Sequence, residues 1–356
     1  AVEVVHEMRA LGMAGDLRLL PGRKRGVGLA AQLAQARTQG VDLAVEVELR
    51  QVVGAVHPPE RRFGPASALL LLRRAVLFVH HEVQARHEIR GCLVDQGAGV
   101  VEAIGPKVKG LKVGDRVAYA NPIGAYAEVL LRPADKLVKI PAGVSDQTAA
   151  AMMLKGMTAW YLLRRTYKVK KGDTILVHAA AGGVGQILCQ WGKHLGATVI
   201  GTVGSEGKVA AAKKAGAKHV IVAEREVVSK RVREITKGKG VPVVYDGTGK
   251  ETFMDSLDCL APLGVMASYG NASGPVPPFN IGILAQKGSL FLTRPTLGSY
   301  TATREDLETA ARDLFSVVKK GAVKIAINQT YPLIEAAQAH RDLEGRKTTG
   351  STVLLP

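Results

Sequence analysis

The stretch "ILVHAAAGGVGQILCQWGKHLGA" (residues 175–197) places a glycine-rich turn between an apolar run and an amphipathic segment. The apolar run predicts a buried strand, and the residues after the turn predict a helix that ends at Gly196. The apolar face of this helix carries Val184, Ile187, Leu188, Trp191 and Leu195. Free amide groups and the dipole at the start of such a helix favour an anion. A strand, a glycine-rich turn and a helix in this order therefore predict a nucleotide phosphate site.

The turn departs from the pattern Gly-x-Gly-x-x-Gly, because Ala180 stands at the first glycine position. Gly182 lets the backbone approach the pyrophosphate of a dinucleotide, and Gly185 lets the helix pack close to the strand. Alanine at position 180 is compatible with the site if the first turn does not need a positive φ. The alternative is that the glycines form a connection in an ordinary α/β domain.

Strand and helix patterns alternate over a long part of the chain. Strands are predicted at 174–179, 198–203, 219–223, 241–247 and 264–270, with helices at 184–196, 206–217, 228–236 and 251–260. Such repeats are typical of a doubly wound parallel sheet. Upstream, short β-type runs between 97 and 141 predict an antiparallel, barrel-like unit, and residues 145–167 predict a helix with Ser145 as N-cap. A helix at 307–321 and a strand at 351–356 could return to the barrel.

The end of the second strand of the alternation indicates which dinucleotide the site takes. Sheets that bind NAD usually carry an acidic residue there, which binds the ribose 2′-hydroxyl. The sequence is "TVGSEGK", with Gly204 and Ser205 in that place and Lys208 one helical turn later. A hydroxyl and an ammonium suit a 2′-phosphate, so we expect NADPH rather than NADH. Glu206 can point to solvent from the start of its helix, and the alternative for Lys208 is a solvated helix lysine.

Composition limits the other classes of function. The formal net charge of +17 is compatible with nucleic-acid binding, but the lysines are scattered and no nucleic-acid module is visible, so nucleic acid is an unlikely main partner. The apolar run at 66–79 is too short to span a bilayer. The three cysteines, Cys92, Cys189 and Cys259, lie far apart, which disfavours a disulfide framework and a structural zinc site and suits the cytoplasm.

The composition of the chain changes near Gln96. Residues 1–95 hold twelve arginines but one lysine, and no asparagine, tyrosine or tryptophan, whereas all eight tyrosines follow residue 97. We hypothesise that residues 1 to about 95 are a frame-shifted or otherwise replaced segment, since another reading frame of GC-rich DNA gives such a composition; the alternative is a separate domain. Intact-mass measurement and resequencing of the coding DNA would separate these two explanations.

From residue 97 to residue 356 the chain resembles the zinc-independent quinone oxidoreductases, the zeta-crystallin-like group of the medium-chain dehydrogenase/reductase superfamily. The matching blocks are "GAGVVEAIG", "KVGDRVAYA", "GAYAEV", "MLKGMTAWYLL", "HAAAGGVGQILCQW", "GTVGSEGK", "VVYDGTG", "SYGNASGP", "LAQKGSLFLTRPTL" and "GRKTTGSTVLLP". The resemblance implies an α/β fold: a Rossmann doubly wound parallel sheet plus a GroES-like, mostly β catalytic domain. The implied divisions are an atypical segment at 1–95, a catalytic domain at 96–150 and 297–356, and an NADPH-binding domain at 151–296.

The resemblance also implies NADPH-dependent reduction of quinones and a homodimer built by edge strands of the nucleotide-binding domains. The implied cofactor-binding residues are Thr158, Ala181, Gly182, Gly183, Val184, Gly185, Gly204, Ser205, Lys208, Tyr269, Gly270, Asn271 and Arg346. Among them, residues 181–185 would hold the pyrophosphate and Ser205 and Lys208 the 2′-phosphate. Thr158 would approach the cofactor near the cleft between the domains. Residues 269–271 would line the nicotinamide, and Arg346 would reach the adenosine phosphate end.

The chain departs from this family at three places. Ala223 stands where many relatives have a tyrosine near the adenine, and Gln96 stands where an acidic residue is expected. The "NFIDTY"-like stretch of the family, whose Asn and Tyr line the substrate and nicotinamide pocket, has no match in residues 1–95.

We expect no metal, because the cysteines and histidines lack ligand spacing, and we interpret His178 as a core residue. No catalytic acid or base is assigned, since the cofactor carries the hydride and solvent can protonate the product. The alternatives are an enal or enone reductase of the same superfamily, or a non-catalytic NADPH- or RNA-binding relative.

Overall fold

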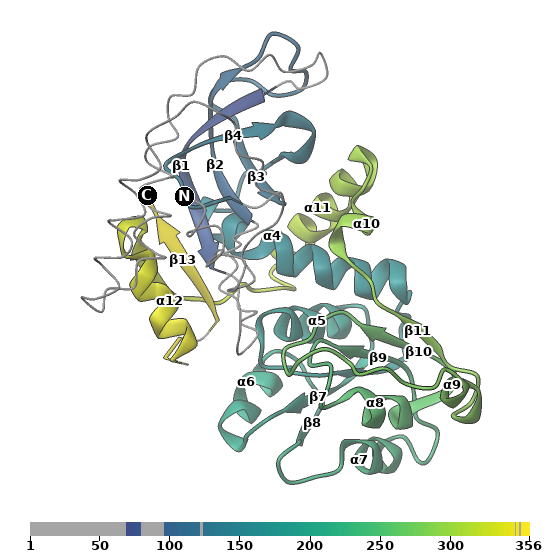
Figure 1. Cartoon of the computed structure of the whole chain (residues 1–356). Helices are drawn as coiled ribbons and strands as arrows, with labels where there is room; N and C mark the ends of the chain where they lie inside the picture. Colours follow the sequence, from purple (N-terminus) through teal and green to yellow (C-terminus); the bar gives the residue numbers. More distant parts are fainter. Residues whose placement is uncertain (1–68, 80–95, 122–123, 346, 349) are drawn as a thin grey trace, which may run out of the picture. The chain divides into compact units, whose positions relative to one another are not determined.

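The computed structural model describes residues 69–79, 96–121, 124–345, 347–348 and 350–356 (Figure 1). These residues belong to one compact unit that extends over 65–356, and the second unit, 1–64, lies outside the described residues. Two sheets, one of six strands and one of seven, organise the described part.

The six-stranded sheet is parallel throughout and has the order β11-β10-β9-β6-β7-β8. Its strands are β6 (Thr174–Val177), β7 (Thr198–Val203), β8 (His219–Val222), β9 (Val241–Asp246), β10 (Leu260–Ser268) and β11 (Phe291–Thr293). The chain runs outward from β6 to β8 and then returns to β9 beside β6. This is the Rossmann doubly wound order, whose switch point lies between β6 and β9. The predicted fold class is confirmed here.

Helices follow the strands of this sheet as the sequence predicts, except that α9 (Gly282–Gln286) was not predicted. They are α5 (Gly183–His194), η3 (Glu206–Lys208), α6 (Val209–Lys214), α7 (Val228–Ile235), α8 (Phe253–Cys259) and α9 (Gly282–Gln286). Successive residues of β6 alternate between two cores: Ile175 and Val177 belong to one cluster and Leu176 to the other. Since side chains alternate along a strand, both faces of the sheet are covered and its strands are apolar without interruption.

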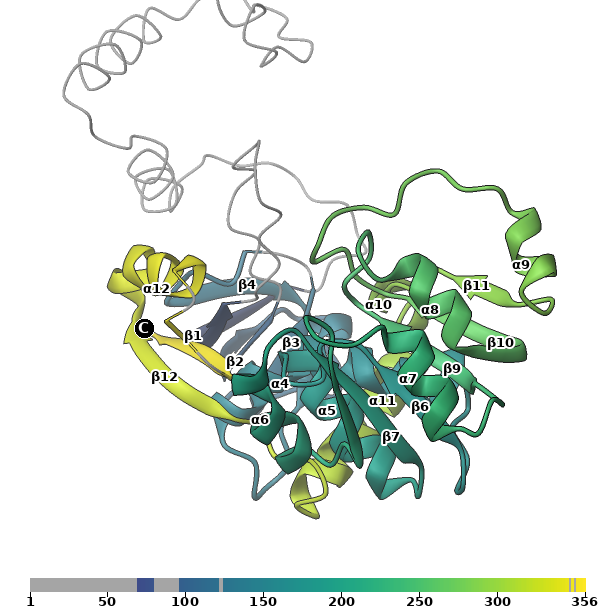
Figure 2. The same cartoon turned by 90° about the horizontal axis from the view of Figure 1, so that it is seen from below.

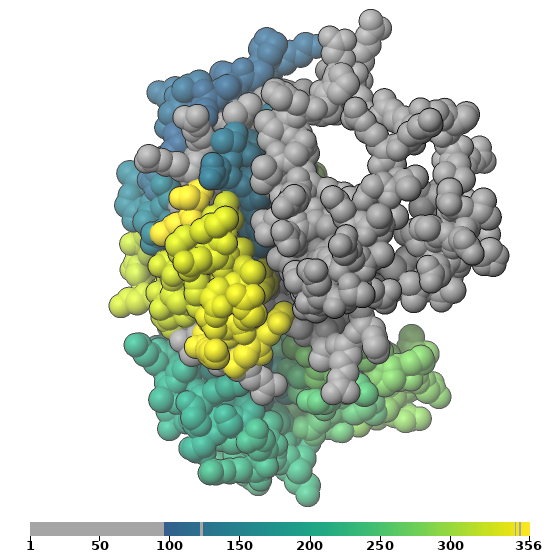
Figure 3. Space-filling model, turned by 60° about the vertical axis from the view of Figure 1, so that its left-hand side comes forward, coloured from purple at the N-terminus to yellow at the C-terminus, as the bar shows by residue number. Residues whose placement is uncertain are grey.

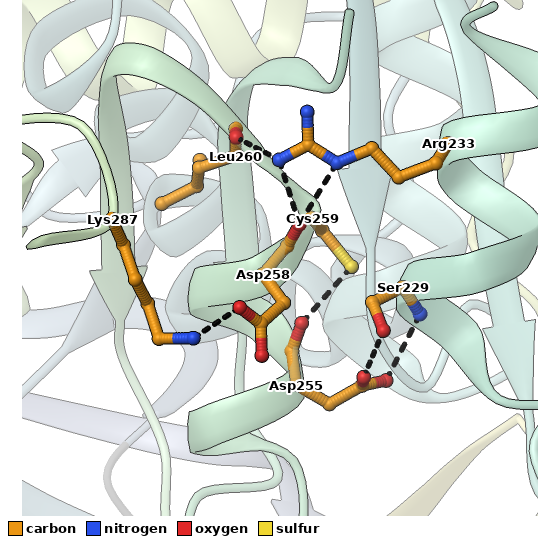
Figure 4. A network of polar contacts seen from close by, with 7 residues as sticks. All are labelled: Ser229, Arg233, Asp255, Asp258, Cys259, Leu260 and Lys287. Atoms are coloured by element: carbon orange, nitrogen blue, oxygen red, sulfur yellow. Dashed lines mark hydrogen bonds and ion pairs between the residues drawn. The ribbon is translucent and has the colours of Figure 1, made fainter. Parts of the chain in front are cut away.

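A polar network joins α7 to α8 (Figure 4). The Arg233 guanidinium donates hydrogen bonds to the carbonyl oxygens of Asp258 (2.8 Å) and Leu260 (2.7 Å) at the end of α8. These carbonyls form the negative end of the helix dipole, which a cation stabilises. The Ser229 amide and hydroxyl donate to the Asp255 carboxylate, and Lys287 pairs with Asp258. The two helices are thereby fixed to each other, and both pack against strands of the sheet.

The seven-stranded sheet contains β1 (Leu69–Val79), β2 (Gln96–Ile104), β3 (Arg116–Ala120), β4 (Val129–Pro133), β5 (Val138–Lys139), β12 (Ile327–Pro332) and β13 (Ser351–Leu355). All its pairs are antiparallel except β12–β13. The C-terminal strand pairs with β1 and so returns to this sheet as expected. β1 comes from the apolar run to which the sequence analysis assigned no element.

C-terminal residues complete the core of the seven-stranded sheet. Helix α12 (Ala336–Glu344), after η4 (Leu333–Glu335), contributes Ala339 and Leu343 to a cluster with Tyr119 and Leu130. Figure 2 shows α12 next to β12, the strand that pairs with β13. In Figure 3 the C-terminal segment, in yellow, packs against residues in blue, which precede residue 146 in the chain. Neither β12 nor α12 was predicted from the sequence.

Helix α4 (Asp146–Tyr161) connects the two sheets, because it contacts β2 and β3 of one and α5 on the other. The Ser145 hydroxyl accepts a hydrogen bond from the Thr148 amide at 3.1 Å, which confirms the predicted N-cap. Nearly all its residues are buried, which explains why its sequence is apolar all round. The π-helical turn η2 (Leu162–Thr166) extends it, and Tyr161 stacks on Tyr300 of α10 (Leu297–Tyr300) at 4.5 Å. Helix α11 (Arg304–Lys319) also packs against α4. The short helix η1 (Ala134–Lys136) precedes β5.

The contact between the first turn of α5 and the end of β6 leaves no space for a side chain. A Cβ at Gly185 would lie 2.2 Å from the Ala179 carbonyl oxygen and 2.9 Å from the Ala180 Cα. Both of these atoms belong to the backbone, so a side chain at position 185 would fit only if the helix moved away from the strand. The sequence argument for Gly185 is therefore supported by the packing.

We expect Gly185→Ala to lower the free energy of unfolding by about 1–3 kcal/mol, the usual cost of overpacking a core. Urea unfolding followed by circular dichroism measures the change. Gly298→Ala in α10 is the matched control, because a Cβ there meets no atom within 4 Å and it should leave the midpoint unchanged. Equal midpoints for both variants would contradict the packing argument.

Candidate functional site

Three loops carry most of the predicted site residues, and all three follow strands of the parallel sheet. They follow β6 (178–182), β7 (204–205) and β10 (269–271). Because the strands are parallel, their carboxyl ends lie at one edge of the sheet, where ligands bind in folds of this type. The structure thus brings together residues that lie up to ninety positions apart in the chain.

The loop after β6 accommodates alanine at position 180. Its left-handed residue is Ala179, with φ 49°, so Ala180 does not need a positive φ. The Ala180 amide donates to the Thr202 carbonyl of β7 at 2.8 Å. A Cβ at Gly201, also on β7, would lie 2.7 Å from the Ala180 Cβ. The methyl group at 180 therefore occupies space that a glycine on the neighbouring strand leaves open.

The first turn of α5 exposes backbone amides at the sheet edge. Its N-cap is Gly182, and no side chain of the described residues caps the helix. A Cβ at Gly182 would lie 3.1 Å from the Ala179 carbonyl oxygen, so the turn is compact as well as open to solvent. Ala181, Gly183 and Val184 are half-buried around it. An uncapped helix start of this kind suits an anion.

A buried polar network lies behind this loop. His178 is 2% exposed; its Nδ1 lies 3.0 Å from the Thr202 hydroxyl and its Nε2 2.9 Å from the Ser256 hydroxyl. Ser256 donates its proton to the Asp246 carboxylate at 2.9 Å, so Nε2–H must donate to Ser256 and Nδ1 must accept from Thr202. Burial lowers the pKa of His178 and keeps it neutral. The histidine is a structural core residue, as the sequence interpretation has it.

The same carboxylate organises the loop after β9. Asp246 accepts hydrogen bonds from the amides of Thr248 (2.8 Å) and Gly249 (3.0 Å). A Cβ at Gly270 would lie 2.5 Å from the Gly247 carbonyl oxygen, so the loops after β9 and β10 touch backbone to backbone. The ring of Tyr269 covers Gly247.

This packing presents Tyr269 and Asn271, both half-buried, at the edge of the sheet. Gly270 between them is buried, and its lack of a side chain lets the loops after β9 and β10 approach each other closely.

The end of β7 holds the residues that the sequence assigns to a 2′-phosphate. Ser205 is half-buried and is the N-cap of η3, and Gly204 and Lys208 are exposed. Glu206 pairs with the Arg225 guanidinium at 2.9 Å, with its side chain 59% exposed, so its carboxylate is directed toward a cation at the surface. Arg225 follows β8 and places a second cation near this end. The sequence argument missed it, because the two segments meet only in the folded sheet.

The remaining predicted residues lie elsewhere. Thr158 is 9% exposed on α4, and Arg346 lies outside the described residues. A cavity of about 1290 Å³ lies between the loop at Lys107 and helix α11 and shares no residue with the predicted set. Its lining is strongly basic, but the glycine-rich turn and the loops described above are not part of it. We therefore place the candidate site at the sheet edge.

Two kinds of feature are absent from the part of the chain that the structure describes. No group of three or more His, Cys, Asp and Glu side chains comes together there as a candidate metal site. Within the same ranges, no helix has both the length and the apolar character that crossing a bilayer requires. The fold and the sheet-edge site define a dinucleotide-binding protein of the medium-chain dehydrogenase/reductase type.

Comparison with known proteins specifies the family. A zinc-binding dehydrogenase family model matches residues 183–316, and an alcohol dehydrogenase GroES-like domain model matches residues 79–142. A quinone oxidoreductase of Pseudomonas aeruginosa is 55% identical over 265 residues, which cover 74% of this chain and 82% of the relative. A 2-haloacrylate reductase of a Burkholderia species is 49% identical over 265 residues, 73% and 80% of the two chains.

A solved structure gives the same result. Escherichia coli quinone oxidoreductase complexed with NADPH matches with a TM-score of 0.76 and 44% identity, covering 83% of this chain and 95% of the other. The chain belongs to the quinone oxidoreductase family of the medium-chain dehydrogenase/reductase superfamily. The resemblance identified from the sequence blocks is confirmed.

Proposed function

We propose that this chain is an NADPH-dependent quinone oxidoreductase that works without zinc. The observation that carries the proposal is the sheet edge itself, where an uncapped α5 lies beside a second strand that ends without an acidic residue. The Escherichia coli relative, solved with NADPH, supports the choice of cofactor.

The residues present fit this cofactor. At the α5 N-cap, Gly182 offers free backbone where a side chain would obstruct a pyrophosphate. At the other end, Ser205 and Lys208 provide a hydroxyl and an ammonium for a 2′-phosphate, and Arg225 pairs with the carboxylate of Glu206. The full proposed set is Thr158, Ala181, Gly182, Gly183, Val184, Gly185, Gly204, Ser205, Lys208, Tyr269, Gly270, Asn271 and Arg346.

When bound, the nicotinamide supplies the hydride for reduction of the quinone. The role of the chain is to bind and orient: the α5 turn holds the pyrophosphate, and Thr158, Tyr269 and Asn271 limit the position of the nicotinamide ring. Solvent supplies the one proton that completes the reduced quinone. Under this proposal residues 151–296 form the cofactor domain, and residues 96–150 with 297–356 form the catalytic domain.

A second candidate, reduction of an activated carbon–carbon double bond, is favoured by the 49%-identical 2-haloacrylate reductase. An enal or enone reductase needs a proton donor beside the substrate α-carbon, and no residue of the described set is assigned that role. Quinone reduction has no such requirement, and we therefore prefer it. A non-catalytic NADPH- or RNA-binding protein is the third alternative.

The purified full chain should oxidise NADPH with 1,4-benzoquinone and at a much lower rate with 2-hexenal. The measurement is the loss of NADPH absorbance under matched substrate concentrations. Faster turnover of the enal would support the second candidate. NADPH binding without turnover of either substrate would support the binding-only alternative.

NADPH should bind much more tightly than NADH, and Lys208→Ala should reduce this preference by about tenfold, since one charge-assisted contact to the 2′-phosphate is lost. Fluorescence titration of both nucleotides measures it. Lys213→Ala, an exposed lysine of α6, is the control and should change neither affinity. Equal affinities of the unmutated protein for NADPH and NADH would refute the assignment.

We further propose a homodimer that forms through β11, the edge strand of the six-stranded sheet. Apolar side chains are exposed around this edge: Leu263 (66%), Ile281 (76%) and Phe291 (59%). Together they make an apolar surface that a second copy would bury. The proposed compartment is the cytoplasm, since Cys189 and Cys259 are free thiols.

Phe291→Asp should convert the dimer into a monomer, because it places a charge in the apolar interface. Light scattering after size-exclusion chromatography gives the mass. Ile334→Asp, at an exposed apolar residue (87%) outside this surface, should remain dimeric. A monomeric unmutated protein at micromolar concentration would contradict the proposal.

A further inference from the structure

A basic cavity lies apart from the sheet edge that carries the candidate cofactor site. It is the cavity of about 1290 Å³ described above, and eight of its twenty lining residues are lysine or arginine, whereas two are acidic. These cations come from three places in the chain: the loop between β2 and β3, the segment of η1 and β5, and helix α11 with the residue after it. The proposed reduction of a quinone by NADPH gives this cavity no role.

The two carboxylates of the lining are already paired with lining cations. Glu308 pairs with Arg304 at 2.7 Å, and Asp135 with Lys136 at 3.6 Å. The Arg304 guanidinium also donates hydrogen bonds to the carbonyl oxygens of Asp135 (2.9 Å) and Leu137 (2.5 Å). The start of α11 is thereby tied to the segment between η1 and β5. A ligand would meet walls that are already fixed to each other, which lowers the ordering cost of binding.

Five lining cations have no carboxylate partner within the described residues. They are Lys107, Lys109, Arg312, Lys319 and Lys320, and all five are exposed. Lysines at the end of a helix stabilise its dipole, which accounts for Lys319 and Lys320. It does not account for Lys107 and Lys109, which belong to the loop on the other wall. Cations gathered on two walls without partners favour an anionic ligand between them.

The buried part of the lining is apolar. Leu111, Val138 and Phe315 are 9%, 4% and 5% exposed and all line the cavity. Val108 and Pro133 are half-buried beside them. A ligand that fills the cavity therefore contacts apolar side chains as well as ammonium groups.

This combination distinguishes between anionic ligands. A lone inorganic anion is too small, since even small organic ligands occupy cavities of about 300–1,000 Å³. Single-stranded nucleic acid stacks its bases on aromatic side chains, and Phe315, the one aromatic residue among the described lining residues, is buried. A second copy of this chain would bring a net charge of the same sign, +17. An extended peptide can direct carboxylates to one side and apolar groups to the other, because its side chains alternate.

We propose that this cavity binds an extended acidic segment of a partner protein. Its carboxylates pair with Lys107 and Lys109 on one wall and with Lys319 and Lys320 on the other, and its apolar side chains contact Phe315. Binding is non-covalent and needs no cofactor. The inference goes beyond the proposed function and does not depend on the NADPH site, which shares no residue with the cavity.

The test uses the full chain and a fluorescein-labelled peptide that contains glutamate and leucine in equal number, and it measures fluorescence anisotropy at physiological ionic strength. Binding should be saturable and should weaken as salt is added, because exposed ion pairs are screened. A peptide of the same length with serine in place of leucine should bind about tenfold more weakly, since its apolar contacts are lost. Equal binding of the two peptides would contradict the role of the apolar lining.

Lys319→Glu combined with Lys320→Glu should raise the dissociation constant of the glutamate–leucine peptide by about tenfold or more, because attraction becomes repulsion. The matched control is Lys213→Glu combined with Lys214→Glu. These two are also adjacent exposed lysines at the end of a helix, α6, so the change in net charge and in the helix dipole interaction is the same. The control should bind the peptide as the unmutated protein does.

Lys107→Glu combined with Lys109→Glu changes the other wall and should weaken binding as well, so the test does not depend on the folding of one variant. Absence of saturable peptide binding by the unmutated protein, or an equal loss in the α6 and α11 variants, would overturn the inference. Tighter binding of oligothymidylate or of phosphatidylglycerol vesicles, lost in the α11 variant, would assign the cavity to nucleic acid or to a membrane surface and would also overturn it. NADPH titration should give the same affinity in every variant, and an unmutated protein that binds the peptide but not NADPH would overturn the proposed function alone.

Discussion

The close approach of α5 to the end of β6 is the constraint on which the rest of the site depends. The helix can touch the strand only because Gly185 has no side chain toward the Ala179 carbonyl oxygen. This contact fixes the helix end at the sheet edge, where its amides are open to a ligand. The neighbouring loops adapt to it: Gly201 makes room for Ala180, and Gly270 makes room for the loop after β9. The site is thus formed by backbone, and backbone packing sets its shape.

The charged side chains of the candidate site lie at two depths, at the surface and in the interior. At the surface, the proposed 2′-phosphate end combines Ser205 and Lys208 with the Glu206–Arg225 pair. In the interior, Lys155 approaches the opposite side of the helix end from α4. The two lysines therefore lie in different surroundings, Lys208 in solvent and Lys155 in the protein interior.

Much of the fold follows from local patterns in the sequence. The parallel doubly wound sheet follows from the alternation of strands and helices between 172 and 270, although its edge strand β11 was not predicted, and the N-cap at Ser145 follows from its position before an apolar helix. β12, with the sequence "INQTYP", alternates too weakly to be recognised, and β1 lies in a segment of unusual composition. These strands are held by pairing with β13, which is a tertiary effect that the local sequence does not carry.

Part of the candidate site could likewise be predicted from the sequence, and part could not. The glycine-rich turn and the missing acid at the end of β7 were visible in the sequence, because each depends on residues close together in the chain. Arg225 and Lys155 were not, because each meets its partner only through the packing of distant elements. Gln96 is a similar case: it is fully buried, its side-chain oxygen accepts from the Leu154 amide at 2.5 Å, and its amide nitrogen has no hydrogen-bond partner among the described residues. Only the packed structure reveals that unsatisfied group.

The central claim is that a cofactor held at the α5 turn passes hydride to a quinone. The most direct measurement is a single-turnover experiment in which protein loaded with NADPH, deuterated or not at the transferring C4 position, is mixed with 1,4-benzoquinone. We expect rapid oxidation of the bound nucleotide and a slower rate with deuterium, because the C4–H bond of the nicotinamide breaks in the observed step. Stable NADPH in the presence of the quinone would contradict it.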